Sequence, residues 1–436
     1  MSEPHKVTKI LFALVVFAFS TAGGRLSAQS SNDVSEFVQK ARSSYEEKNY
    51  VTMIENLKLA LNVRPNYGSY VYYLAIGYAL NGNQAESLKW LNRLAEMGLV
   101  YPVATNKDFV SLRNSDEFKA VVSRIENNAK PVGHSTTAFT LHEKGFVPEG
   151  IAYDPIEKAF YLGSVYQRKI VSINSSGEAR DFSKSADGLW SVMGMRVDPK
   201  RRLLWVCTAA HQQMKDAREA ENGISGIFKY DLDTKKLIKK YLLPAQPKRH
   251  WLGDLVLDSN GDVFASDSIS PAIYRINRKQ DELELFLESK DFVNPQGLAF
   301  TSDEKRLFMA DYLKGVFSID MKTKVPTLLK TPSATNTFGL DGLYFYQGKL
   351  IGIQNGVRPN RIVELTVAGA EIQKLEVVEA NNPVFDEPTL AVLADDTLFY
   401  IANSQWAMID DQGGLAPAEK LSEPVVLRLQ LKITDH

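Results

Sequence analysis

A short motif recurs six times along the C-terminal two thirds of the chain. Its first copy occupies residues 147–155, where a carboxylate precedes a glycine, a short apolar run follows, and an Asp-Pro pair marks a turn. A unit repeated in this way cannot bury its apolar face alone, so neighbouring copies must pack against one another. The residue that begins the motif in each copy is, in order, Glu149, Met193, Gly253, Gln296, Asp341 and Pro388.

Each copy contains several short runs rich in β-branched and aromatic residues, separated by turn residues. In the third copy the run 253–258 is followed by a turn at 259–262, a second run at 263–267 and a third at 272–276. A weaker fourth run closes each copy. Four antiparallel strands repeated six times are typical of a β-propeller. The sequence therefore predicts a six-bladed β-propeller from 136 to 432, closed by a strand at 138–141 beside 425–429.

The region before the propeller has a different periodicity. Ala41 and Ala75, Asn49 and Asn83, and Leu57 and Leu91 are each 34 residues apart, which is the period of tetratricopeptide repeats. We expect a helical domain at 30–128, a linker at 129–135, and therefore a multidomain chain, α plus all-β. The expected helices are 33–48, 50–62, 68–80 and 84–97, followed by a shorter cap that begins with a capping box from Asn114 to Glu117.

Five tyrosines cluster around the third expected helix, and two interpretations of them remain open. They line a groove for a peptide, or they pack between the helices, as large aromatic side chains commonly do. These residues are Tyr67, Tyr70, Tyr72, Tyr73 and Tyr78.

Composition excludes several classes of function. With 51 basic and 52 acidic side chains, the chain has no charge excess that would attract nucleic acid. Its single cysteine, Cys207, excludes an intramolecular disulfide framework and a cysteine-based zinc site.

The N-terminus resembles a secretory signal. Lys6 and Lys9 precede an apolar run at 10–19 and the small-residue pattern that ends at Ala28. We expect a signal peptide at 1–28, cleavage after Ala28, a periplasmic or secreted product, and no membrane span once the signal is removed. A retained N-terminal anchor is the alternative.

The residues that begin the six motifs are expected to form a ring at one mouth of the propeller's central channel. Carboxylate and amide oxygens from separate strands suit a hard cation such as calcium. Two long connections, 209–225 and 404–424, could cover this mouth, because long loops in compact domains tend to be functional. The flanking and rim residues predicted for the same mouth are Asp254, Asn294, Glu387, His211, Asp267, Asp311, Asn355 and Asn403.

Three of these motifs, Glu149-Gly150, 296–300 and Asp341-Gly342, resemble the senescence-marker-protein/gluconolactonase family. That family is related to paraoxonases and strictosidine-synthase-like propellers. The resemblance covers residues 136 to 432 and implies calcium or another divalent metal at the channel mouth. It further implies Glu149, Gln296 and Asp341 as metal ligands, with Asp341 also the general base for lactone hydrolysis.

The chain departs from the family pattern at three positions. Gln296 stands where the family has asparagine, and Gly253 stands where an asparagine usually lies, which leaves Asp254 as the polar group there. Met193 occupies the position of the catalytic histidine of paraoxonases. His250 and His211 are candidates to replace that histidine, unless they are ordinary loop residues.

Two functions are therefore expected as alternatives. One is an exported calcium-dependent hydrolase that acts on a small-molecule lactone or ester. The other is a non-catalytic module that binds protein, peptide or carbohydrate, with a protein partner on the helical repeats.

Overall fold

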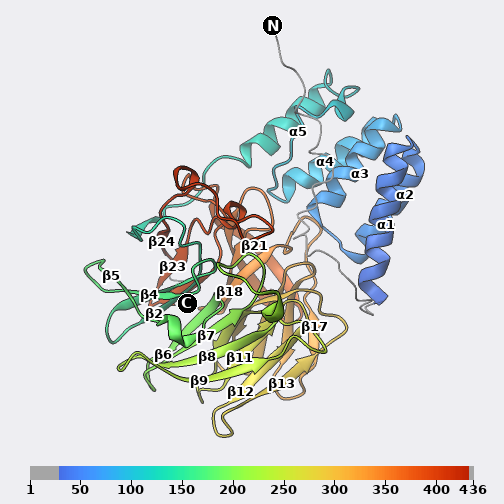
Figure 1. Ribbon diagram of the computed structural model, residues 1–436. Helices are drawn as coiled ribbons and strands as arrows, with labels where there is room; N and C mark the ends of the chain where they lie inside the picture. The colour runs from blue at the N-terminus through green and yellow to red at the C-terminus, as the bar shows by residue number, and fades with distance from the viewer. Residues whose placement is uncertain (1–28, 432–436) are drawn as a thin grey trace. The chain divides into compact units, whose positions relative to one another are not determined.

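The computed structural model describes the backbone of residues 29–431 and the side chains of residues 34–431. The expected signal peptide, 1–28, lies outside the described residues. The chain divides into two compact units (Figure 1): residues up to 93 together with 102–122, and residues 94–101 together with those from 123 onward.

Helices make up the N-terminal part of the described chain. Small side chains at Ala41 and Ala75 are fully buried, and the side chain of Asn49 caps the second helix by accepting from the Thr52 N–H. The assignment of these helices as tetratricopeptide repeats remains a prediction. Their bounds are α1 (Gln29–Glu46), α2 (Tyr50–Val63), α3 (Gly68–Leu80), α4 (Gln84–Glu96), the 3₁₀ turn η1 (Lys107–Phe109) and α5 (Asp116–Asn127).

The structure decides between the two interpretations of three tyrosines in this region and corrects one expectation, the capping box. Tyr70, Tyr72 and Tyr78 are buried, so they pack inside the helical unit and do not line an open groove. The capping residue of α5 is Ser115, whose hydroxyl accepts from the Phe118 N–H at 3.1 Å, so the capping box placed at Asn114 was wrong by one position. The cause is that α5 begins at Asp116, which makes Ser115 the residue next to its first turn.

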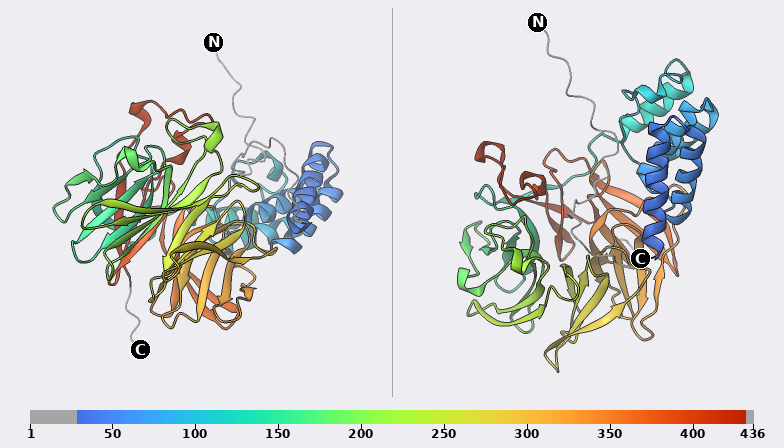
Figure 2. Two further views of the ribbon diagram at one scale, coloured as in Figure 1. Left: turned by 60° about the horizontal axis from the view of Figure 1, so that its bottom comes forward. Right: turned by 45° about the vertical axis from the view of Figure 1, so that its right-hand side comes forward.

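The second unit contains six four-stranded antiparallel sheets arranged as the blades of a propeller (Figures 1 and 2), as predicted. Blade one consists of β2 (Pro148–Asp154), β3 (Ala159–Ser164), β4 (Ile170–Ile173) and β5 (Ala179–Asp181). Blade two consists of β6 (Ser191–Asp198), β7 (Leu203–Ala209), β8 (Ser225–Asp231) and β9 (Lys236–Leu243). Blade three consists of β10 (Leu252–Leu257), β11 (Val263–Asp267), β12 (Ala272–Asn277) and β13 (Glu282–Glu288). Blades four and five are β14 (Pro295–Phe300), β15 (Arg306–Asp311), β16 (Gly315–Asp320) and β17 (Pro326–Leu328), then β18 (Leu340–Tyr346), β19 (Lys349–Gln354), β20 (Arg361–Ala368) and β21 (Glu371–Ala380).

The sixth blade joins the two ends of the propeller. Its strands are β22 (Ala391–Ala394), β23 (Thr397–Ile401), β24 (Val425–Gln430) and β1 (Thr136–Thr140). Strand β1 pairs antiparallel with β24, with Phe139 opposite Val426, which is the predicted closure. Closure removes the free edges that an open array of sheets would expose.

The recurring motif is a β-bulge in the innermost strand of each of the first five blades. In β2 the register shifts between Pro148 and Ile151, so Glu149-Gly150 forms the irregular pair. Equivalent shifts enclose the motif residues of β6, β10, β14 and β18. A bulge bends a strand and re-aims its side chains, so these five bulges place the motif residues in equivalent positions.

The glycine of the motif is required where neighbouring blades meet. A Cβ added to Gly150 would lie 1.9 Å from the carbonyl oxygen of Met193 in the next blade, and one added to Gly297 would lie 2.3 Å from the Leu343 nitrogen. At these two bulges the innermost strands therefore touch through backbone, which leaves no space for a side chain.

Gly150→Ala is expected to lower the free energy of unfolding by about 1–3 kcal/mol or more, because the new methyl group must displace backbone of the adjacent blade. The measurement is urea unfolding. Gly253→Ala is the matched control, since a Cβ there meets only the ends of two side chains, Gln296 and Ser268, each at 3.2 Å. Equal losses in the two variants would contradict this explanation.

Apolar side chains fill the spaces between adjacent blades, and Cys207 lies in one of these clusters. Its side chain is fully buried, and burial raises the pKa of the thiol well above its usual value. Within residues 29–431, no helix has the length and apolar character needed to cross a membrane.

Candidate functional site

The five bulges lie next to one another around one end of the central channel, here named the ring end. The glycine contacts establish this: the Gly150 bulge meets Met193, the Gly194 bulge meets Asp254, and the Gly297 bulge meets Asp341. The innermost strands run from this end to the other, here named the far end. The structure thus brings Glu149, Gln296 and Asp341 to one end of one channel.

Glu149 is buried and is held by a residue distant in sequence. Its Oε2 accepts a hydrogen bond from the indole Nε1–H of Trp406 at 2.7 Å. Burial, followed by the nearby charge of Asp341, raises the pKa of Glu149 well above its usual value. The carboxyl group is therefore held in a fixed orientation and readily keeps a proton.

Asp341 is oriented by a chain of two hydrogen bonds. Its Oδ2 accepts from Asn355 Nδ2 at 2.7 Å, and Asn355 Oδ1 accepts from the Tyr312 hydroxyl at 3.0 Å. Burial raises the pKa of Asp341 to about 7, and the charges of Asp254 and Glu387 add to the increase. A carboxyl group with this pKa changes protonation state near neutral pH.

Gln296 reaches across the space that Gly253 leaves open. Its Nε2 donates to Asn294 Oδ1 at 2.9 Å, and Asn294 in turn donates to the Ser268 carbonyl at 3.1 Å. Its Oε1 lies 3.2 Å from where a Cβ on Gly253 would stand. The two departures from the family pattern therefore compensate for each other, since the longer amide occupies the room that the glycine provides.

A third carboxylate, Glu387, lies at the same end. Burial raises its pKa, and Arg358 partly offsets that effect, as does the backbone N–H of Trp406. Its backbone is in the left-handed region, with φ of 63°.

An aromatic cluster closes the ring end. The ring of His211 lies 4.5 Å from that of Trp251 and 5.7 Å from that of Trp406, measured between centroids. His211 and Trp406 lie in the two long connections, and these connections meet, because Gln213 Nε2 donates to the Ile409 carbonyl at 3.2 Å. The two predicted cover segments thus form one cover.

The structure places His211 and His250 in buried positions. Burial lowers the pKa of His211 to about 3, so it is neutral at pH 7 and a poor proton acceptor. Its Nδ1 accepts from the Gln213 backbone N–H. His250 contacts Asp267 through Nδ1 at 2.6 Å and packs against Tyr274. These are the surroundings of packed side chains, not of loop residues facing solvent.

Four other predicted rim residues have structural contacts. Asp254 is buried and forms an ion pair with Arg196 at 3.3 Å. Asp267 and Asp311 are fully buried and accept backbone N–H groups of adjacent turns. Asn403 bridges the backbone of Glu423 and Val425. These side chains stabilise connections between strands.

Trp406, Trp251 and Tyr312 are the site residues that sequence reasoning missed. Trp406 belongs to one of the long connections, so loop length was a signal for its segment. For Tyr312 the only signal was its position directly after the strand end at Asp311.

The oxygen donors at the ring end fit a hard divalent cation. In Glu149, Asp341 and Gln296 one polar atom is fixed by a hydrogen bond, while Glu149 Oε1, Asp341 Oδ1 and Gln296 Oε1 have no hydrogen bond within residues 34–431. Such partners around metal ligands orient them for binding. In the described part of the chain no three His, Cys, Asp or Glu side chains form a metal-binding group, so this set depends on the amide of Gln296.

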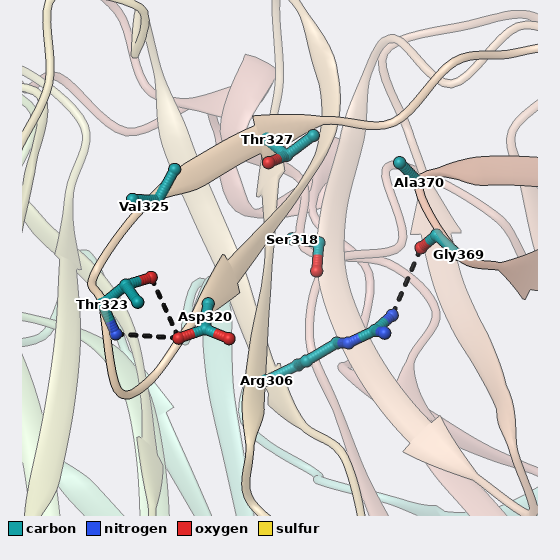
Figure 3. Close-up of a pocket in the computed structure, with 8 residues that line it drawn as sticks. All are labelled: Arg306, Ser318, Asp320, Thr323, Val325, Thr327, Gly369 and Ala370. Carbon is teal, nitrogen blue, oxygen red and sulfur yellow. Dashed lines mark hydrogen bonds between the residues drawn. The ribbon is translucent and has the colours of Figure 1, made fainter.

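Two cavities lie away from the ring end. One, of about 790 Å³, is lined by the C-terminal halves of the innermost strands and thus lies at the far end. The other, of about 270 Å³ (Figure 3), is a shallow pocket between the outer turns of blades four and five. There Arg306 donates to the Gly369 carbonyl, and Asp320 accepts from its own turn at Thr323. The small pocket therefore holds side chains that stabilise turns.

No family model matches the chain, and no curated protein matches it. Solved structures similar to it include a gluconolactonase from Xanthomonas campestris, at 13% identity over 69% of this chain and 99% of that chain, with a TM-score of 0.45. Regucalcin, a calcium-binding protein from Agrobacterium tumefaciens, matches at 12% identity over 68% and 94%, with a TM-score of 0.47. The PQQ-bound aldose sugar dehydrogenase from Streptomyces coelicolor matches at 11% identity over 69% and 98%, with a TM-score of 0.46. The fold assignment itself rests on the strand topology.

Proposed function

We propose that the chain is an exported hydrolase of the lactonase or esterase type, dependent on calcium or another divalent metal, with its active site at the ring end. One observation carries the proposal. The buried carboxyl group of Glu149, the partly buried carboxyl group of Asp341 and the amide of Gln296 come from three blades to the same end of the channel, each oriented by a partner and each with one oxygen that has no hydrogen bond within residues 34–431. The resemblance of the same motifs to gluconolactonases supports it.

Glu149, Gln296 and Asp341 would hold the metal. A bound divalent cation polarises an ester carbonyl and lowers the pKa of a bound water. The negative charges of neighbouring carboxyl groups help to raise the pKa of both Glu149 and Asp341, and a bound cation would counteract this effect.

Asp341 is the proposed general base. Its pKa of about 7 lies near the pH of most enzyme assays, which is the range where a base is both deprotonated and able to accept a proton. Asn355 and Tyr312 hold the carboxylate in one orientation while it accepts the proton of a water molecule. Neutral His211 is excluded from this role by its low pKa.

The cover and the charge of the site select the substrate. Three carboxyl groups at the ring end offset the charge of a bound divalent cation, so the site would have no net positive charge to attract an anion, and an uncharged lactone or ester is the expected class. The rings of Trp251 and Trp406 lie 6.3 Å apart between centroids, and in the proposed site their apolar faces would limit the access of water. A substrate therefore enters when the connection that carries Trp406 moves.

The proposed activity is tested by turnover of a lactone and an aryl ester, with calcium and with chelator. Turnover is expected only with the metal. Thermal or urea unfolding gives an independent reading, because a metal bound only by the folded state at 100 times its Kd adds about 2.7 kcal/mol to the free energy of unfolding. Turnover that persists in chelator would overturn the metal-dependent reaction.

The alternative is a non-catalytic binding module, and the bond between Trp406 and Glu149 favours it. That bond uses one of the two carboxylate oxygens of a predicted metal ligand and ties the connection that carries Trp406 to the ring end. A protein partner on the helical unit belongs to the same alternative. Absence of any calcium effect on unfolding, together with absence of turnover, would support this module.

A further inference from the structure

The central channel is divided by a layer of side chains between the ring end and the far end. Arg196 donates from Nη2 to Asp254 at 3.3 Å and lies over the ring of Tyr344, 5.5 Å from its centroid. The Tyr344 hydroxyl accepts the backbone N–H of Ala391 at 2.5 Å. These contacts connect blades two, three, five and six. The lining of the far-end cavity includes none of Glu149, Gln296 and Asp341.

The far-end cavity has a volume typical of small-molecule sites. Its volume of about 790 Å³ lies within the range of about 300–1,000 Å³ that such sites occupy. Of its nineteen lining residues, only Lys158, Arg196 and Asp395 carry charge. Lys158 and Asp395 lie in exposed turns at the rim, so Arg196 is the charged group inside. Apolar side chains of the innermost strands line the rest of the wall, among them Val197, Leu298, Phe300 and Leu393.

Arg196 has hydrogen-bonding capacity left for a ligand. A guanidinium has five N–H donors. Arg196 donates hydrogen bonds to three acceptors: the Met195 carbonyl at 2.8 Å, the Asp254 carboxylate and the Tyr344 side chain. At least one N–H donor of Arg196 therefore remains for a ligand, and Arg196 lines the cavity.

The charge around Arg196 decides which ligand fits. Asp254 neutralises Arg196, and the neighbouring carboxyl group of Asp341 adds negative charge on the other side of the dividing layer. An anion would gain no net attraction there and would lose its hydration. A neutral hydrogen-bond acceptor loses less hydration and still uses the free donor.

We propose that the far-end cavity is a second binding site, for an uncharged and mostly apolar small molecule whose carbonyl or similar acceptor receives a hydrogen bond from Arg196. The site is independent of the proposed hydrolase, because it lies beyond the dividing layer and uses none of Glu149, Gln296 or Asp341.

The test uses the full chain and the neutral dye Nile red, followed by fluorescence. We expect saturable binding and displacement by three matched naphthalenes. The ketone 2-acetylnaphthalene should displace the dye about tenfold more tightly than the carboxylate 2-naphthoate. It should also bind several-fold more tightly than 2-ethylnaphthalene, which has the same shape without an acceptor. None of the three is a substrate for ester hydrolysis.

Two variants locate the binding. Leu393→Asp places a charge on the half-buried wall and should weaken dye binding about tenfold or more, whereas Leu285→Asp, at an exposed apolar position on β13, should leave it unchanged. Arg196→Lys keeps the charge beside Asp254 but loses the planar fork, so it should remove the preference for the ketone over 2-ethylnaphthalene without changing the affinity for the hydrocarbon. The proposal is overturned by absence of saturable binding, by equal binding in the Leu393→Asp variant, or by a carboxylate that binds as tightly as the ketone.

Discussion

Asp341→Asn is expected to lower kcat for lactone or ester hydrolysis by about 10²- to 10⁴-fold, which is the usual contribution of a general base. The amide has the same size as the carboxyl group and still accepts a hydrogen bond from Asn355, so the ring end keeps its shape. What is lost is the group that accepts a proton. The measurement is steady-state turnover of the lactone with calcium present.

The matched control for this variant is Asp395→Asn. Asp395 is an exposed carboxylate at the far end of the same channel, so its replacement changes the net charge equally without touching the ring end. Full activity in Asp341→Asn, with the same response to chelator as the original chain, would exclude Asp341 as the base.

The pH profile gives a second reading of the same group. Turnover needs the deprotonated carboxylate, so kcat/KM should rise with pH and level off above the pKa of Asp341. That pKa is about 7 without a cation, and a bound cation stabilises the charged form and lowers it. The midpoint of the profile should therefore lie below 7 at saturating metal.

The fold was predictable because one physical constraint repeats in the sequence. The bulges of blades one, two, four and five have a glycine where neighbouring blades meet, and each innermost strand has an apolar run with a turn after it. The candidate metal ligands could be aligned with one another for the same reason, since Glu149, Gln296 and Asp341 occupy the same position in their bulges.

The partners of the ring residues could not be predicted in this way. Trp406 bonds to Glu149 across 257 positions, and that contact depends on how a long connection folds over the channel, for which the sequence has no periodic signal. Asp254 lies one position after the ring register, where the other bulges have glycine, and its buried carboxylate is stabilised there by Arg196 and the backbone N–H groups of Leu255 and Leu298. Register fixes where a residue lies along a strand, and contacts between blades decide where its side chain points.

The same carboxyl groups should make the metal-free protein less stable as the pH rises. The pKa of Asp341 is about 7 in the folded chain and about 4 in an unfolded one, so between these values the folded chain holds the extra proton. Stability is then highest below pH 4 for this group and falls as the pH rises to 7. The change for Asp341 alone is at most about 4 kcal/mol, and Glu149 acts in the same direction.

Urea unfolding in chelator at pH 5 and pH 8 measures this effect. Asp341→Asn should be more stable than the original chain at pH 8, and its stability should change less between the two pH values, because an amide does not titrate. Asp395→Asn should keep the full change. Calcium should restore stability at pH 8 in the original chain and have little effect on Asp341→Asn, since a cation compensates charges that burial otherwise disfavours. If the free energy of unfolding of Asp341→Asn depended on pH as strongly as that of the original chain, Asp341 would not be the group that destabilises the folded protein at high pH.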